Sequence, residues 1–222
     1  MNLAALLSGG KDSLYASYVA AMHGWNITHA VTIRPRQLSW MYHTDNIHLT
    51  EVIADALNLP LVIRDSTAEK EQELDDLEQA LTGLDIDGVV SGAVASEYQR
   101  TRIERVCHHL GLKSFTPLWH KTSEPLLRDM INAGFDSIIV AVAAEGLDET
   151  WLGRQINVEA IDDLVRLHDR YGIHVAGEGG EYETLVLDCP LYHRRLNTQK
   201  SEARWDGSRG TLHIGEVTLG PK

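Results

Sequence analysis

Short apolar runs alternate with segments of helical periodicity along the first half of the chain. The apolar runs predict strands at residues 3–7, 30–33, 61–64, 88–91 and 114–116. The segments between them predict helices at residues 12–23, 45–57, 69–81 and 96–110. This alternation is typical of a parallel sheet with helices on both faces and right-handed crossovers. We therefore expect an α/β fold with a Rossmann-like parallel sheet of about five strands.

The pattern changes after residue 120. Two helices are predicted at residues 124–133 and 158–171, with a strongly apolar strand at residues 137–143. Short strands without intervening helices follow at residues 184–188, 194–197, 203–205 and 211–219. We expect a second, smaller α+β domain, so that the domains are residues 1–120 and 121–222.

The composition is that of an ordinary globular protein. Apolar residues make up 43% of the 222 residues, and 20 Lys and Arg against 32 Asp and Glu give a formal net charge of −12. The acidic balance counts against a broad nucleic-acid-binding surface. The two cysteines, Cys107 and Cys189, are too few for a disulfide framework or a structural zinc site. No apolar run approaches the roughly 20 residues of a membrane-spanning helix, so we expect a cytoplasmic protein, and a homo-oligomer is compatible with the sequence.

The most informative stretch is the hexapeptide Ser-Gly-Gly-Lys-Asp-Ser at residues 8–13, between the first strand and the first helix. A glycine turn in this position presents backbone N–H groups and a positive helix end to an anion, as in phosphate sites. A Walker A loop would need glycine and a hydroxyl residue where this chain has Ala5 and Asp12. The adjacent glycines also lack the spacing of a dinucleotide fingerprint.

The hexapeptide is similar to the pyrophosphate loop of the N-type ATP pyrophosphatases, which cleave ATP between the α and β phosphates. In that setting Lys11 would place positive charge where negative charge develops, and Asp12 would hold Mg²⁺. The alternative is a plain strand-to-helix turn with a surface lysine. The expected ATP-binding residues are Ser8, Gly9, Gly10, Lys11, Asp12, Ser13 and Gly92.

A second group of polar residues lies at the start of the helix predicted at residues 96–110. An apolar stripe that includes Cys107 marks the inward face of this helix, and towards the N-terminus the stripe runs into Ser96 and Gln99, with Arg100 at its border. Ligands of open α/β sheets bind at the carboxyl edge, where this helix begins. We expect these three residues to face the site; the alternative is a helix capped by Ser96 with its arginines in solvent.

A third group is the glycine-rich turn at residues 177–184, which contains Glu178, Glu181 and Glu183. Like charges crowded on a turn cost stability unless a cation or hydrogen-bond donors lie nearby. This favours a functional site over the alternative, a solvated acidic hairpin.

Together these motifs resemble the diphthine-ammonia ligase family over nearly the full chain. The resemblance rests on the pyrophosphate loop, the Gly-x-x-x-Ser-x-Tyr-Gln-Arg-x-Arg-x-Glu segment from Gly92 and the Glu-Gly-Gly-Glu-Tyr-Glu-Thr turn from Glu178. Met41-Tyr42-His43 resembles a further short motif. The resemblance implies an ATP-pyrophosphatase domain followed by a substrate-binding domain. It also implies ATP and Mg²⁺ as cofactors, and ammonium and translation elongation factor 2 carrying diphthine as partners.

The reaction implied is adenylation of the diphthine carboxylate followed by amidation with ammonia, which completes diphthamide. Lys11, Arg100 and Glu181 are the expected catalytic residues. The acidic turn would bind the quaternary ammonium of diphthine, with Tyr182 offering an aromatic face, or one glutamate would orient ammonium and take its proton; both roles stay open. The expected substrate-binding residues are His43, Ser96, Tyr98, Gln99, Arg100, Glu178, Gly179, Gly180, Glu181, Tyr182 and Glu183.

Three other functions are compatible with the same motifs. A related pyrophosphatase would act on another acceptor, in cobalamin salvage or in tRNA thiolation. A nucleotide-binding module without enzymatic activity would explain the glycine loop but not the acidic turn.

Overall fold

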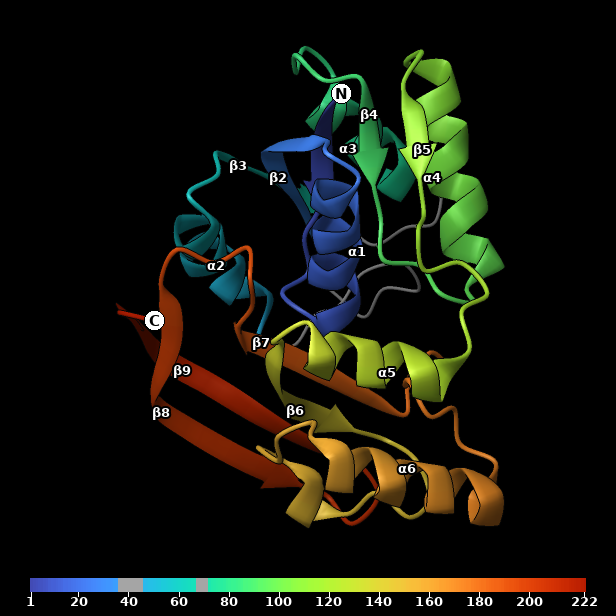
Figure 1. Cartoon of the computed structure of the whole chain (residues 1–222), viewed down its shortest axis with the longest axis vertical. Coiled ribbons are helices and arrows are strands. Elements are labelled where there is room, and N and C mark those ends of the chain that lie inside the picture. Colours follow the sequence, from blue (N-terminus) through green and yellow to red (C-terminus); the bar gives the residue numbers. More distant parts are fainter. Residues whose placement is uncertain (36–45, 67–71) are drawn as a thin grey trace. The chain divides into compact units, whose positions relative to one another are not determined.

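A computed structural model of the chain describes residues 1–35, 46–66 and 72–222 (Figure 1). The chain divides into two compact units, Met1–Trp119 and His120–Lys222. Each unit has its own sheet, and the two sheets differ in strand direction.

The first unit contains a five-stranded parallel sheet in the order β3-β2-β1-β4-β5. The α/β fold with a Rossmann-like sheet is therefore confirmed. The strands are β1 (Asn2–Leu6), β2 (Asn26–Pro35), β3 (Leu61–Ser66), β4 (Gly88–Val90) and β5 (Lys113–Phe115). The helices are α1 (Lys11–Met22), η1 (Ile47–Leu49), α2 (Thr50–Leu57), α3 (Gln72–Leu81) and α4 (Glu97–His109). The strand order reverses between β1 and β4, and such a switch point is where open α/β sheets bind ligands.

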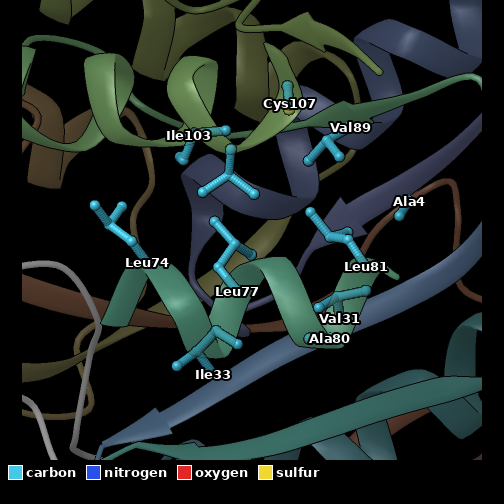
Figure 2. Packing of buried hydrophobic residues seen from close by; sticks show 11 residues of the cluster. Ala4, Val31, Ile33, Leu74, Leu77, Ala80, Leu81, Val89, Ile103 and Cys107 are labelled. Atoms are coloured by element: carbon cyan, nitrogen blue, oxygen red, sulfur yellow. The ribbon is translucent and has the colours of Figure 1, made fainter. Parts of the chain in front are cut away.

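One core of the first unit lies where α3 and α4 pack on the sheet (Figure 2). Leu77 of α3 and Cys107 of α4 meet Ala4 of β1 in this cluster. Because neighbouring strand residues point to opposite faces, the buried Leu3 and Ala5 belong to the other face of the sheet. The central strand β1 is thus covered on both sides, which holds the loop that follows it in a fixed position.

The second unit contains a four-stranded antiparallel sheet in the order β7-β6-β9-β8. The smaller α+β architecture is therefore confirmed for this part of the chain. Its elements are α5 (Ser123–Asn132), β6 (Asp136–Val142), η2 (Glu149–Trp151), α6 (Val158–Tyr171), β7 (Tyr182–Asp188), β8 (Arg195–Trp205) and β9 (Gly210–Gly220).

The two short strands predicted at residues 194–197 and 203–205 are wrong, because they are parts of one strand, β8. The residues between them stay paired with β9, from Thr198 opposite Val217 to Arg204 opposite Thr211. Figure 1 shows the two strands running side by side as a long ribbon. Residues 198–204 are all exposed, so no buried face imposes the apolar alternation by which a strand is predicted.

Candidate active site

The glycine loop joins β1 to α1, and β1 is one of the two strands at the switch point of the sheet. Gly9 has a φ of 85°, a left-handed conformation that glycine adopts without strain. Gly10 is the N-cap of α1 and has no side chain to satisfy the first N–H groups of the helix. A helix start of this kind suits an anion.

The two serines of the loop fix its shape. The Oγ atoms of Ser8 and Ser13 lie 3.2 Å apart. Ser13 Oγ donates to the carbonyl of Gly10 at 3.0 Å, and Ser8 Oγ accepts from the N–H of Gly10 at 3.3 Å. The hydroxyls therefore hold the backbone of the loop in place before any ligand binds.

Lys11 and Asp12 form an ion pair inside the loop. Lys11 is only 3% exposed, and its Nζ lies 2.9 Å from Asp12 Oδ2. The other carboxylate oxygen, Asp12 Oδ1, is buried and has no hydrogen-bond partner among the described residues. Buried carboxylate oxygens almost always accept a hydrogen bond, so we expect Oδ1 to interact with a ligand when one is bound.

Magnesium fits this position. Mg²⁺ is commonly held by one or two carboxylates together with substrate phosphates, and Asp12 supplies one carboxylate beside a phosphate-type loop. The described residues contain no cluster of three or more His, Cys, Asp or Glu that could hold a metal by itself. Phosphate oxygens and water are the usual further ligands of Mg²⁺ in such sites.

Gly92 brings the segment after β4 against this loop. A Cβ atom at Gly92 would lie 2.5 Å from the carbonyl carbon of Asp12 and 2.6 Å from the amide nitrogen of Ser13. Only a residue without a side chain allows these two backbones to approach so closely. The ATP-binding role predicted for Gly92 stays a prediction, and the structure adds a packing reason for the glycine.

Ser96 caps α4, because its Oγ accepts from the N–H of Gln99 at 3.3 Å. The hydroxyl of Ser96 therefore has the helix-capping role that was the alternative to facing the site. Arg100 is paired with Glu97 at 2.9 Å and with Glu104 at 2.6 Å, and it lies over the ring of Trp119. The hydrogen bond that Arg100 donates to the Glu97 carboxylate is the main cause that raises the pKa of Arg100. Its charge is therefore already balanced, and an anion would compete with two carboxylates.

Tyr98 packs against the core of α3 and α4, and the guanidinium carbon of Arg102 lies 3.5 Å from the centroid of its ring. No site role was predicted for Arg102 from the sequence. The spacing of the charged residues could have distinguished it from Arg100. Arg100 has glutamates three residues before and four residues after it, which favours ion pairs within the helix, whereas Arg102 has none at those positions.

In the second unit, Glu181 is bound to the backbone of its own loop. Its Oε1 accepts from the N–H of His174 and its Oε2 from the N–H of Gly179, both at 2.8 Å. Gly177 and Gly180 have φ values of 77° and 84°, which shape the turn around this carboxylate. The contacts of Glu181 thus support the fold of the turn, and its predicted catalytic role stays untested.

Tyr182 is 3% exposed, and its hydroxyl donates to the carbonyl of Val175 at 2.7 Å. Its ring is part of the core and does not offer an open face to a cation. Glu178 and Glu183 are half-buried members of the same turn. The predicted His43 lies outside the described residues.

The structure therefore groups the expected residues in two places. The pyrophosphate loop and Gly92 come together in the first unit, with the start of α4 following in the same connection. The acidic turn lies in the second unit.

A parallel sheet with a glycine loop and an ion-paired lysine at its switch point defines an α/β nucleotide-binding protein with a pyrophosphate loop. The family model described as the diphthamide synthase N-terminal domain matches residues 1–114, and that described as the diphthamide synthase C-terminal domain matches residues 122–219. The chain belongs to the diphthamide synthase family.

Curated relatives agree with this assignment. A mouse protein named diphthine--ammonia ligase is 39% identical over 227 residues, which cover 91% of this chain and 85% of the relative. The human protein of the same name is 37% identical over 226 residues, which cover 91% of this chain and 84% of the human protein. A solved structure described as a predicted subunit of a tRNA methyltransferase from Methanocaldococcus jannaschii shares 16% identity at a TM-score of 0.44, covering 86% of this chain and 98% of that one.

No helix among the described residues is long and apolar enough to cross a membrane. The cytoplasmic location stays a prediction.

Proposed function

We propose that this chain is an ATP-dependent ligase that amidates diphthine on translation elongation factor 2 with ammonia. The names and coverage of the relatives support the reaction. The observation that carries the proposal within the molecule is the pyrophosphate loop, in which Lys11 is buried and Asp12 keeps one buried oxygen without a hydrogen bond.

The reaction has two steps. A carboxylate oxygen of diphthine bonds to the α-phosphorus of ATP, the bond to the oxygen bridging the α and β phosphates breaks, and pyrophosphate leaves. The nitrogen of ammonia then bonds to the acyl carbon and loses a proton, while the acyl carbon–oxygen bond breaks and AMP leaves. Each cycle therefore consumes one ATP and one ammonia and yields the amide, AMP and pyrophosphate.

The first unit would bind the nucleotide. Pyrophosphate gains negative charge as it leaves, and the N-terminus of α1 together with the Lys11 ammonium favours that charge. When Mg²⁺ is bound it neutralises phosphate charge, and Asp12 would hold it through Oδ1. Lys11 keeps Asp12 oriented through the contact with Oδ2.

The second unit would bind the acceptor. The quaternary ammonium of diphthine is a cation without N–H donors, so it is recognised by negative charge and not by a hydrogen bond. We assign this recognition to Glu178 and Glu183, the two other glutamates of the half-buried turn, and assign to Glu181 the backbone hydrogen bonds that shape the turn.

The test is the release of AMP and pyrophosphate from Mg-ATP and ammonium, with and without diphthine-bearing elongation factor 2. We expect AMP only with the acceptor, in equal amount to the diphthamide detected by mass spectrometry of the factor. Asp12→Asn should bind ATP but require more Mg²⁺ for the same rate. AMP formed without the acceptor, or without diphthamide, would be the product of hydrolysis and would contradict the proposed reaction.

A further inference from the structure

Three arginines of α4 differ in what surrounds them. Arg100 is paired with two glutamates, and Arg105 is exposed. Arg102 is half-buried, and it forms no ion pair within the described part of the chain. Its Nε, like that of Arg100, is buried and has no hydrogen-bond partner there. A buried guanidinium donor without an acceptor is costly, so this arrangement needs a reason.

Tyr98 fixes the position of the Arg102 guanidinium. The guanidinium carbon lies 3.5 Å from the centroid of the Tyr98 ring, and Tyr98 is itself packed on the core. A guanidinium whose central carbon lies over an aromatic ring contacts that ring without a hydrogen bond, so the contact uses none of its N–H groups. The stacking therefore orients the group without using the donors that recognise an anion.

The side chain of Arg102 reaches towards the sheet edge that holds the glycine loop. Tyr98 lies one turn before Arg102, and side chains of an α-helix point back towards its N-terminus. Because α4 connects the parallel strands β4 and β5, its N-terminus lies at the carboxyl edge of the sheet. Gly92, in the same connection, packs directly on Asp12 and Ser13 of the loop.

We propose that Arg102 binds an oxyanion of the reactants, a phosphate of ATP or the carboxylate of the acceptor. This rests on the proposed function, which supplies both anions. Phosphate and carboxylate both match the planar fork of arginine, which can donate two parallel hydrogen bonds. Arg102 is thus a substrate-binding residue, and the glutamate-paired Arg100 is the neighbour that shapes the start of α4.

The experiment compares Arg102→Met, Arg102→Lys and the control Arg105→Met. Methionine keeps a long stem over Tyr98 but removes the charge, and lysine keeps the charge but loses the fork. Arg105 belongs to the same helix and has the same charge, but it is exposed. Thermal unfolding of each variant is measured first, so that a loss of binding can be separated from a loss of fold.

Two measurements distinguish the source of the anion. The Kd for Mg-ATP is measured by calorimetry without the acceptor, and the KM for diphthine-bearing elongation factor 2 is measured at saturating ATP. Arg102→Met should increase either the Kd for Mg-ATP or the KM for the acceptor about 10- to 150-fold, which corresponds to the loss of a hydrogen bond to a charged group. An increased Kd for ATP assigns the phosphate; an unchanged Kd with an increased KM assigns the carboxylate. Arg102→Lys should recover only part of the loss, and Arg105→Met should match the wild type.

The inference is overturned if Arg102→Met equals Arg105→Met in both measurements, or if its effect is confined to thermal stability. Failure of the proposed function looks different. A wild type that binds ATP but forms no AMP with the factor would refute the ligase, while the ATP measurement would still decide whether Arg102 binds phosphate. A wild type that does not bind ATP would overturn both proposals.

Discussion

Replacing Gly92 by alanine tests whether the packing between the β4–α4 connection and the glycine loop positions the nucleotide site. The added Cβ would lie 2.5 Å from the carbonyl carbon of Asp12, 2.6 Å from the amide nitrogen of Ser13 and 2.7 Å from the carbonyl oxygen of Asp12. Non-bonded carbon atoms prefer separations of about 3.5–4.0 Å. Because all three neighbours are backbone atoms, no side chain can rotate away, and the two segments must separate by about 1 Å.

Two effects follow from that displacement. Forcing one carbon into a packed site costs about 1–3 kcal/mol of unfolding free energy, or a fall of about 2–12 °C in Tm. A 1 Å shift of groups that position a reactant costs on the order of 100-fold in rate. We therefore expect Gly92→Ala to lower kcat/KM for ATP about 100-fold at a temperature where the variant remains folded.

Gly88→Ala is the matched control, because its Cβ would also lie too close to a backbone atom, at 2.6 Å from the carbonyl oxygen of Lys113. Gly88 is at the amino end of β4, whereas Gly92 follows its carboxyl end. Gly88→Ala should lose a similar amount of stability but keep its kcat/KM for ATP. Equal catalytic losses in the two variants, or a fully active Gly92→Ala, would refute the reasoning.

Three further predictions concern single side chains. Lys11→Met, which removes a cation that is 3% exposed, should lower kcat for AMP release on the order of 100- to 1000-fold without abolishing folding; a near-normal kcat would contradict its role. In Glu181→Gln, one of the two backbone N–H groups that the carboxylate accepts from faces an amide N–H instead, so urea unfolding should show a loss of about 1–3 kcal/mol that Glu145→Gln, at an exposed position of the same unit, does not show; equal stabilities would contradict the assignment. Burial raises the pKa of Cys107 and of Cys189 to about 11, so iodoacetamide should label the native protein slowly at pH 8 and faster as the pH approaches that value, whereas rapid labelling at pH 8 would contradict this burial.

Sequence periodicity predicted those helices and strands that bury one face and expose the other, because unequal burial imposes a pattern of apolar and polar residues. The helix predicted at residues 158–171 coincides with α6, which Asn157 caps with a hydrogen bond to the N–H of Ala160 and which Gly172 ends at a φ of 74°. The strand β8 was missed as a single strand because its middle is exposed on both sides and is held by pairing with β9 alone. Backbone pairing with the neighbouring strand β9 leaves no periodic trace in the side chains of β8.

The same limit applies to the site. The position of the glycine loop followed from the order of strand, glycines and helix, which are local features. The approach of Gly92 to Asp12 is a contact between segments separated by about 80 residues, and only the folded chain shows it. The different surroundings of Arg100 and Arg102 could be predicted only in part. The spacing of Glu97 and Glu104 indicates the ion pairs of Arg100, but it does not indicate that Arg102 lies over the ring of Tyr98.

The acidic turn shows how one motif can serve two purposes. Crowded carboxylates suggested a cationic ligand, but Glu181 offsets its own charge with two backbone N–H groups and holds the turn together. Tyr182 begins β7 and points into the core, so the next residue, Glu183, points to the opposite face of the strand. Glu178 and Glu183 are the other two glutamates of this turn, and we assign the recognition of the quaternary ammonium to them, while Glu181 holds the backbone of the turn in place. Variants of the first two should therefore change the KM for the acceptor, whereas variants of Glu181 should change the stability of the turn.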